Sequence, residues 1–214
     1  MSNKKIWDSL FKTDPKFTKP ITGKTYSGTS PDPYYVISRM TDEFGPCGDG
    51  WGVEILDDKI VEVPQEKAGL HYCRISLWYM NGNKKCSVQA FGGTQLYYTS
   101  SKGKFIFDDD APKKSMTDAM VKAASMIGMC GDIFMGLYDD AKYINGLKEE
   151  FRKQDSRNLT QLQQTGLEAI LTALRAKNLA QAQDHAAALS DEDWGVVWAA
   201  MPPAAQKAYS QPQD

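Results

Sequence analysis

The chain has 214 residues, of which 42% are hydrophobic and 24% charged, and its formal net charge at pH 7 is −2. This composition excludes a disordered chain and predicts one well-buried domain with a small appendage. Because there is no run of about 18 apolar residues and no apolar signal core at the N-terminus, we expect a cytoplasmic protein without a membrane segment.

The first part of the chain predicts an arm followed by a short helix. Residues 14–33 are rich in Pro, Gly, Ser and Thr and carry little periodicity, which favours an ordered arm or loop. Residues 34–44 place apolar side chains at helical spacing. The glycine-rich GPCGDG that follows is typical of a helix terminus.

The next part predicts an antiparallel sheet. Residues 51–56, 59–64, 70–80 and 85–100 are rich in residues that favour strands, and 70–80 alternates between two faces. The NGNKK segment at residues 81–85 is a strong hairpin signal, because Asn and Gly accept positive φ at little cost. We predict a meander of about three to five strands.

Basic residues are concentrated in this sheet region. No Asp or Glu occurs between Lys67 and Phe107. The segment carries five further basic residues: Arg74, Lys84, Lys85, Lys102 and Lys104. They are interleaved with Tyr, Trp and Phe, a mixture that single-stranded nucleic-acid sites use for phosphate contact and base stacking. The alternative is buried aromatic rings beside solvated lysines, and composition alone favours neither interpretation.

Residues 113–134 predict a long helix that covers the sheet. Apolar residues recur along one face of it, and we expect this stripe to pack on the sheet: Met116, Met120, Ile127 and Phe134. The lysines of the segment lie outside the stripe: Lys113, Lys114 and Lys122. They are therefore free to line a groove.

The composition changes again between residues 154 and 158, and the remainder predicts a small three-helix tail with a cap at Ser190. The fold class is therefore α+β, an antiparallel β-meander packed on a long helix. We expect a core with its N-terminal arm over residues 1–153 and a helical domain over 158–214. Trp194 and Trp198 lie one turn apart and either close the core of the tail or dock a partner.

The sequence shows no strong catalytic motif. No C-x-x-C pair occurs among the four cysteines, and Cys47 with His71 lacks a visible base or orienting group. The glycine-rich segments do not match phosphate-binding patterns, and the carboxylate pairs resemble solvated turns. We expect reduced thiols, no metal, no cofactor and no enzymatic activity, with metal-dependent nuclease action as an alternative.

Two segments carry a resemblance to a known family. YYVISRMTDEFGPCGDGWGVEI, followed after the β-rich stretch by KKSMTDAMVKAASMIGMCGDIFMGLYDD, resembles the single-strand DNA-annealing proteins grouped around the eukaryotic Rad-fifty-two protein and its phage relatives, including Red-beta. The resemblance covers about residues 34 to 150. It depends on the order and spacing of the two motifs and on the meander between them.

The resemblance implies an ATP-independent recombinase that binds single-stranded DNA and the annealed duplex intermediate along a groove of a homo-oligomeric ring or filament. Its core would be a β-β-β-α unit. By position, the DNA-backbone contacts of the family correspond to Lys102, Lys104, Lys113 and Lys122 here. A basic residue in the first helix of the eukaryotic protein aligns with Tyr35, where a stacking contact would replace it.

We therefore expect DNA binding, in homologous recombination and repair, by Lys114, Arg74, Lys84, Lys85 and Tyr98 as well. Red-beta also has a helical tail that recruits partners, so the C-terminal helices are expected to bind an exonuclease or a single-strand-binding protein. An alternative function is a non-enzymatic scaffold module that recruits protein partners.

Overall fold

The computed structural model describes residues 3–22, 27–100 and 102–210, and its fold class is α+β as predicted. Its contacts divide the chain into an N-terminal unit, Met1–Asp140, and a C-terminal unit, Ala141–Asp214. The sequence placed the boundary between residues 153 and 158. In the structure the helix α5 (Ala141–Arg157) instead groups with the C-terminal helices, because it packs against α8 (Asp191–Ala200).

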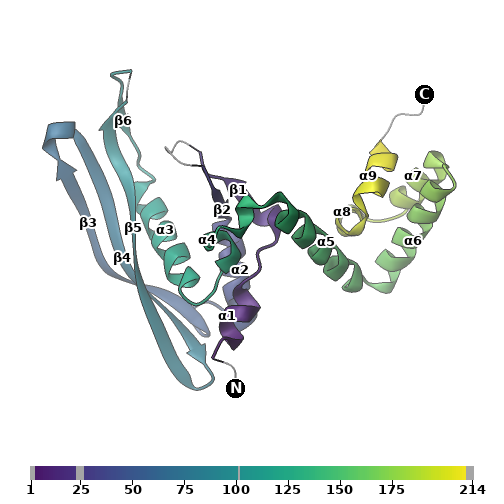
Figure 1. Cartoon of the computed structure of the whole chain (residues 1–214), viewed down its shortest axis with the longest axis horizontal. Coiled ribbons are helices and arrows are strands. Elements are labelled where there is room, and N and C mark those ends of the chain that lie inside the picture. The colour runs from purple at the N-terminus through teal and green to yellow at the C-terminus, as the bar shows by residue number, and fades with distance from the viewer. Residues whose placement is uncertain (1–2, 23–26, 101, 211–214) are drawn as a thin grey trace. The chain divides into compact units, whose positions relative to one another are not determined.

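The N-terminal unit combines a sheet with helices on one side (Figure 1). Its helices are α1 (Lys5–Leu10), α2 (Pro33–Phe44), α3 (Ala111–Ser125) and α4 (Gly131–Phe134), with 3-10 turns η1 (Pro15–Phe17), η2 (Pro64–Glu66) and η3 (Leu137–Asp139). Its strands are β1 (Thr18–Pro20), β2 (Thr29–Pro31), β3 (Trp51–Val63), β4 (Ala68–Asn81), β5 (Lys84–Thr99) and β6 (Phe105–Phe107).

The main sheet is an antiparallel meander in the order β3-β4-β5-β6, as the alternating pattern indicated. The predicted hairpin is confirmed: β4 and β5 pair up to Asn81 and Lys84, and Gly82 supplies the positive φ of 61° that the turn requires. The two strands expected over 51–56 and 59–64 are one strand, β3. A register shift between Ile55 and Asp57 lets it continue past the irregular pattern.

Helix α3 covers one face of β4 and β5 with small residues. Ala119 and Ala123 are fully buried. A Cβ at Gly92 of β5 would lie 2.0 Å from the carbonyl oxygen of Ser115, so the helix backbone lies almost directly on the strand. Of the apolar stripe predicted to pack here, Met120 is 4% and Ile127 7% exposed. The prediction is wrong for Met116 and Phe134, which are 36% and 42% exposed. Phe134 does not belong to α3 but ends the separate helix α4.

The predicted helix over 113–134 ends early, at Ser125. Gly128 and Cys130 both take positive φ, 104° and 53°, and turn the chain around α1. A Cβ at Gly128 would lie 2.6 Å from the Cα of Trp7. Periodicity alone continued the helix to Phe134, but the close approach of α1 requires a turn there, and α4 follows as a separate short helix.

A buried polar network fixes the N-terminal segment against α4. Asp132 is fully buried and accepts hydrogen bonds from the Thr13 backbone N–H at 2.9 Å and from the Thr13 hydroxyl at 2.6 Å. The Tyr138 hydroxyl donates to the Thr13 carbonyl oxygen at 2.6 Å. Buried polar groups need such partners, so this network specifies where the first residues of the chain lie.

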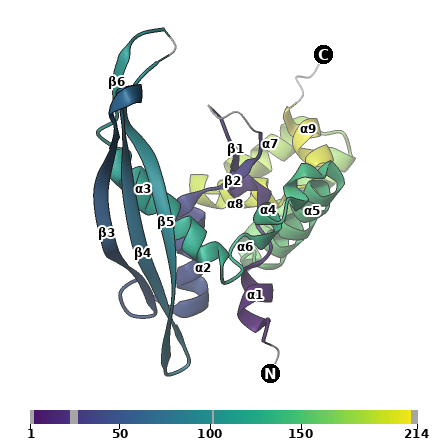
Figure 2. The same cartoon turned by 60° about the vertical axis from the view of Figure 1, so that its left-hand side comes forward.

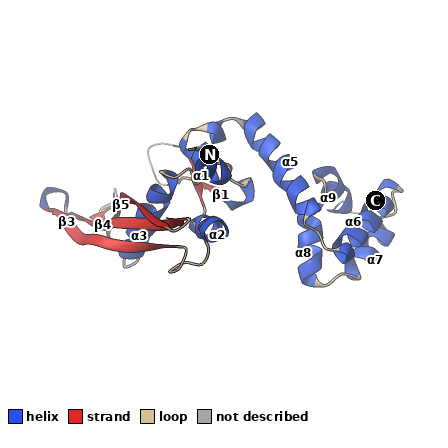
Figure 3. Ribbon diagram, turned by 90° about the horizontal axis from the view of Figure 1, so that it is seen from below, coloured by secondary structure: helices blue, strands red, loops and turns tan. Residues whose placement is uncertain are grey.

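The described part of the C-terminal unit is entirely helical (Figure 3). After α5 it contains α6 (Gln161–Arg175), α7 (Leu179–Ala187), α8 and α9 (Pro203–Ser210). The predicted cap at Ser190 is confirmed, since its Oγ accepts from the Asp193 N–H at 3.1 Å. Among the described residues, no helix has the length and apolar character needed to cross a membrane.

Candidate nucleic-acid interface

The predicted DNA-binding residues lie in several places on the N-terminal unit. Lys113 and Lys114 lie at the start of α3, and Lys122 lies in its last turn. Lys102 and Lys104 lie in the turn before β6. The remaining basic residues lie on the hairpin of β4 and β5: Arg74, Lys84 and Lys85. Tyr98 lies half-buried on β5, and Tyr35 lies in the core.

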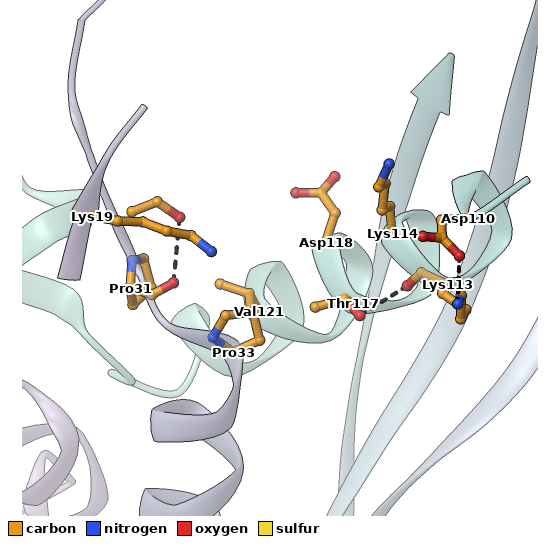
Figure 4. Close-up of a pocket in the computed structure, with 10 residues that line it drawn as sticks. Lys19, Pro31, Pro33, Asp110, Lys113, Lys114, Thr117, Asp118 and Val121 are labelled. Atoms are coloured by element: carbon orange, nitrogen blue, oxygen red, sulfur yellow. Dashed lines mark hydrogen bonds and ion pairs between the residues drawn. The ribbon is translucent and has the colours of Figure 1, made fainter. Parts of the chain in front are cut away.

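A groove runs between the N-terminal arm and the first turns of α3 (Figure 4). We call it the arm–helix groove, and its cavity volume is about 360 Å³. It is lined by Lys19, Ser30, Pro31, Pro33, Asp110, Lys113, Lys114, Thr117, Asp118 and Val121. Pairing of β1 with β2 brings Lys19 to this place, opposite lysines that are almost a hundred residues later in the chain.

Two lysines of the groove are held at its edge by acidic neighbours. Lys113 forms an ion pair with Asp110, and Lys114 Nζ lies 2.6 Å from Asp108 Oδ2. These hydrogen bonds raise the pKa of both lysines, so both stay charged across the neutral range. The lysine side chains remain 77% and 54% exposed, so the pairs are surface pairs that a phosphate can replace at little cost.

Lys102 and Lys104 extend into solvent from the turn between β5 and β6. Gly103 takes φ of 75° there, and the Lys104 N–H donates to Ser100 Oγ at 3.1 Å. Tyr98, opposite Ile106 in the β5–β6 pairing, is half-buried. These residues form a short basic projection near the β6 edge.

Lys122 lies apart from the groove, about 13 Å along the helix from Lys113 at 1.5 Å per residue. Its Nζ is 5.2 Å from the centroid of the Phe134 ring, a cation–π contact. The other basic predictions, Arg74, Lys84 and Lys85, lie on β4 and β5 of the sheet. In a single copy of the chain the predicted lysines therefore lie on separate elements: α3, the turn before β6, and strands β4 and β5.

Tyr35 is not available to a ligand, which corrects the expectation of a stacking contact. It is 9% exposed and its ring stacks on Phe17 at 4.9 Å. Its hydroxyl accepts from the Asp14 N–H at 3.2 Å and from Arg39 at 3.4 Å. Burial raises the pKa of this hydroxyl, as expected for a structural residue.

Sequence reasoning missed Lys19 and Lys59. Lys19 belongs to an arm without periodicity, so nothing local indicated that it faces α3. Lys59 lies on the edge strand, where its Nζ is 5.3 Å from the ring centroid of Tyr72. Only the register of β3 on β4, which pairs Lys59 with Tyr72, shows this contact.

The chain was compared with protein-family models, curated proteins and solved structures, and none of them matches it.

Proposed function

We propose that this protein binds single-stranded DNA and anneals complementary strands in homologous recombination, without ATP, as a homo-oligomeric ring or filament built on an annealing-protein core. The observation that carries the proposal is the arm–helix groove, where Lys19, Lys113 and Lys114 converge on one open cavity. Two of these lysines belong to the second segment that resembles annealing proteins.

The groove suits the DNA backbone rather than the bases. The described residues that line it include three lysines but no aromatic side chain on which a base could stack. Lysine ammonium groups contact phosphates as point charges and carry no sequence information. A strand held in this way keeps its bases available for pairing, which annealing requires.

The homo-oligomer is supported by the edge strand β3. Thirteen residues long, it ends the sheet on one side and exposes apolar side chains, among them Ile55 at 57% and Ile60 at 53%. A long edge strand with exposed apolar side chains can pair with another chain, and its five charged residues would have to find partners there or stay in solvent. A second copy of the protein could cover this edge, and pairing of β3 with the opposite edge of the next sheet would repeat the unit into a ring or filament.

The proposal is tested by mixing two complementary oligonucleotides at low salt, with no ATP and no divalent metal. The protein is expected to accelerate their annealing. Absence of any acceleration contradicts the proposal, and a requirement for magnesium with cleavage products would indicate a nuclease instead.

Replacing both Lys113 and Lys114 by Ala should weaken single-strand binding and flatten its salt dependence. If each lysine contacts one phosphate, the slope of log affinity against log salt falls by about 0.7 per lysine. A salt titration of oligonucleotide binding measures this slope.

The matched control replaces Lys148 and Lys153, two exposed lysines of α5, by Ala and should leave the slope unchanged. Changing Asp108 and Asp110 to Asn removes the competing acids and should tighten binding. The proposal is contradicted if the groove and control lysines have equal effects.

A scaffold function is the second candidate and is favoured by one observation. Trp194, Trp198 and Tyr209 of the C-terminal unit form an aromatic cluster, with ring centroids 5.2 to 5.7 Å apart. The cluster packs on the buried core of Ile170, Val197 and Met201. It also lines a hollow of about 370 Å³ that a partner such as an exonuclease or a single-strand-binding protein could fill.

A further inference from the structure

One face of the main sheet carries aromatic and basic side chains, and no helix described in the N-terminal unit covers it. Helix α3 packs on the opposite face, and Figures 1 and 2 show no described helix of the N-terminal unit against this one. Strand alternation and register assign six large side chains to it: Lys59 of β3, Tyr72, Arg74 and Trp78 of β4, and Lys85 and Phe91 of β5. We call this surface the aromatic sheet face.

At the centre of the face two rings stack. Tyr72 and Phe91 have centroids 5.4 Å apart and an angle of 27° between their planes. The residue directly opposite Tyr72 is Gly93, which leaves room for the Phe91 ring to lean across the strands. Phe91 remains 54% exposed, so this pair is not part of the core.

Cations surround the rings. Lys59 Nζ lies 5.3 Å from the Tyr72 centroid, and Lys85 Nζ lies 4.6 Å from the Trp78 centroid. Arg74, paired with Phe91 in the register, has a buried Nε without a hydrogen-bond partner among the described residues. The Nε–H is therefore a donor that the described residues do not satisfy.

Acidic residues on the same face leave a positive balance. Asp57 pairs with Lys59 at 3.1 Å, and Glu54 pairs with Lys85 at 3.1 Å. Both are exposed surface pairs, which a phosphate could replace. Arg74 has no corresponding ion-pair partner among the described residues, although it lies close enough to Asp57 to help lower the pKa of that carboxyl, after the larger effect of Lys59.

We propose that the aromatic sheet face binds single-stranded nucleic acid by its bases, which stack on Phe91 and Tyr72 while Arg74, Lys59 and Lys85 contact the flanking phosphates. This inference rests on the proposed function, because it assumes that the chain binds single strands. It assigns a second binding surface with a different chemistry from the arm–helix groove. The groove holds phosphates, and the sheet face holds bases.

The occupant follows from the mixture of groups. An aromatic platform with interleaved cations matches the π-face and phosphate of a nucleotide, and stacking tolerates every base. A second copy of this chain would instead have to place apolar groups against the rings and carboxylates against the three cations. That occupant is one outcome of the test below.

The test replaces Phe91 by Ala and, separately, by Leu, which keeps apolar volume but removes the aromatic ring. The matched control is Ile60→Ala, because Ile60 is 53% exposed on the opposite face of the same sheet. Binding of the full-length protein is measured by fluorescence anisotropy with two labelled probes of equal length, an oligothymidylate and an abasic phosphodiester strand. Light scattering gives the assembly size of each variant.

Both Phe91 variants are expected to weaken oligothymidylate binding by at least about five-fold, the lower end of what base–aromatic stacking contributes. The abasic strand should bind equally to all variants, and Ile60→Ala should change neither affinity. Crosslinking with an iodouracil-substituted strand should label a peptide that contains Phe91.

Three results would overturn the inference. If Phe91→Ala binds oligothymidylate as well as the unaltered protein does, the face is not a DNA surface although the proposed function stands. If the variant lowers the assembly size and weakens both probes alike, the face is a contact between copies of the chain. If the unaltered protein binds neither probe, the proposed function fails as well.

Discussion

Cys130 shows how strongly the turn after α3 is enclosed. Its side chain is 1% exposed, and burial raises the pKa of the thiol from 9.0 to about 11, with the Thr13 hydrogen bond lowering it in part. Because the folded pKa exceeds the unfolded one, the folded state keeps this proton as the pH rises. The contribution of Cys130 to stability is therefore full below pH 9 and is lost as the pH rises towards 11.

We expect thiol reagents to distinguish the cysteines. Reagents attack the thiolate, and a pKa shift of two units lowers the thiolate fraction about 100-fold at pH 8. Cys47 is exposed and should react rapidly with a disulfide reagent, whereas Cys130 should react only on unfolding. Peptide mapping after a short exposure measures this. Equal labelling of both would contradict the burial of Cys130.

Single residues were predictable where the signal is local. The cap at Ser190 and the turn at Gly82 need only their immediate neighbours, and both are confirmed. Tyr35 and Met116 depend on what packs against them from distant segments. Local sequence patterns at these two positions do not show whether the side chain is buried or exposed.

At the level of elements, the contact between α3 and β5 depends on one glycine. A Cβ at Gly92 would meet the Ser115 carbonyl oxygen at 2.0 Å and the Ala119 nitrogen at 2.6 Å. Both are backbone atoms, which cannot rotate away as a flexible side chain can. At the neighbouring Gly93, the closest atoms to an added Cβ lie at 3.6 Å, an ordinary contact distance.

Gly92→Ala should therefore lower the free energy of unfolding by about 2–3 kcal/mol, because the added carbon forces the helix off the sheet. Gly93→Ala, the matched control, should be close to neutral. Urea unfolding of both variants provides the comparison. Similar losses at both positions would contradict the close approach of α3.

The elements were predictable in type and less so in extent. Alternation and helical spacing indicated α2, β4, β5 and α6. The end of α3 depends on the close approach of α1, and the continuity of β3 depends on a register shift. Neither can be seen in the periodicity of the sequence. Helix α9 begins at Pro203, directly after Pro202, although two consecutive prolines favour a stop when considered alone.

At the scale of the whole molecule, the division at Asp140 separates the proposed DNA surfaces from the helical unit. The arm–helix groove and the aromatic sheet face are both made by residues before 141. A chain that ends at residue 140 should therefore retain single-strand binding within about a factor of three. Anisotropy with the same oligonucleotide measures it.

Circular dichroism of the truncated chain confirms that it is folded before binding is compared. Complete loss of DNA binding by a folded 1–140 chain would favour the scaffold function, in which the C-terminal helices supply the binding. The complementary 141–214 chain should not bind the oligonucleotide.

The candidate site was predictable in composition but not in arrangement. Clustered basic residues beside aromatics indicated a nucleic-acid surface. Their division into a phosphate groove and a sheet face follows from strand pairing, which places Lys19 beside α3 and Lys59 beside Tyr72. Local patterns in a sequence do not determine such pairings.

The network around Asp132 has a consequence for synthesis of the chain. Its hydrogen bonds join residues 119 and 125 positions apart, so Thr13 is fixed by a segment that is synthesised much later. Contacts of such long range slow folding, because the loop must close before they form. During synthesis Thr13 cannot form these hydrogen bonds before Asp132 and Tyr138 have emerged, so this part of the unit folds late.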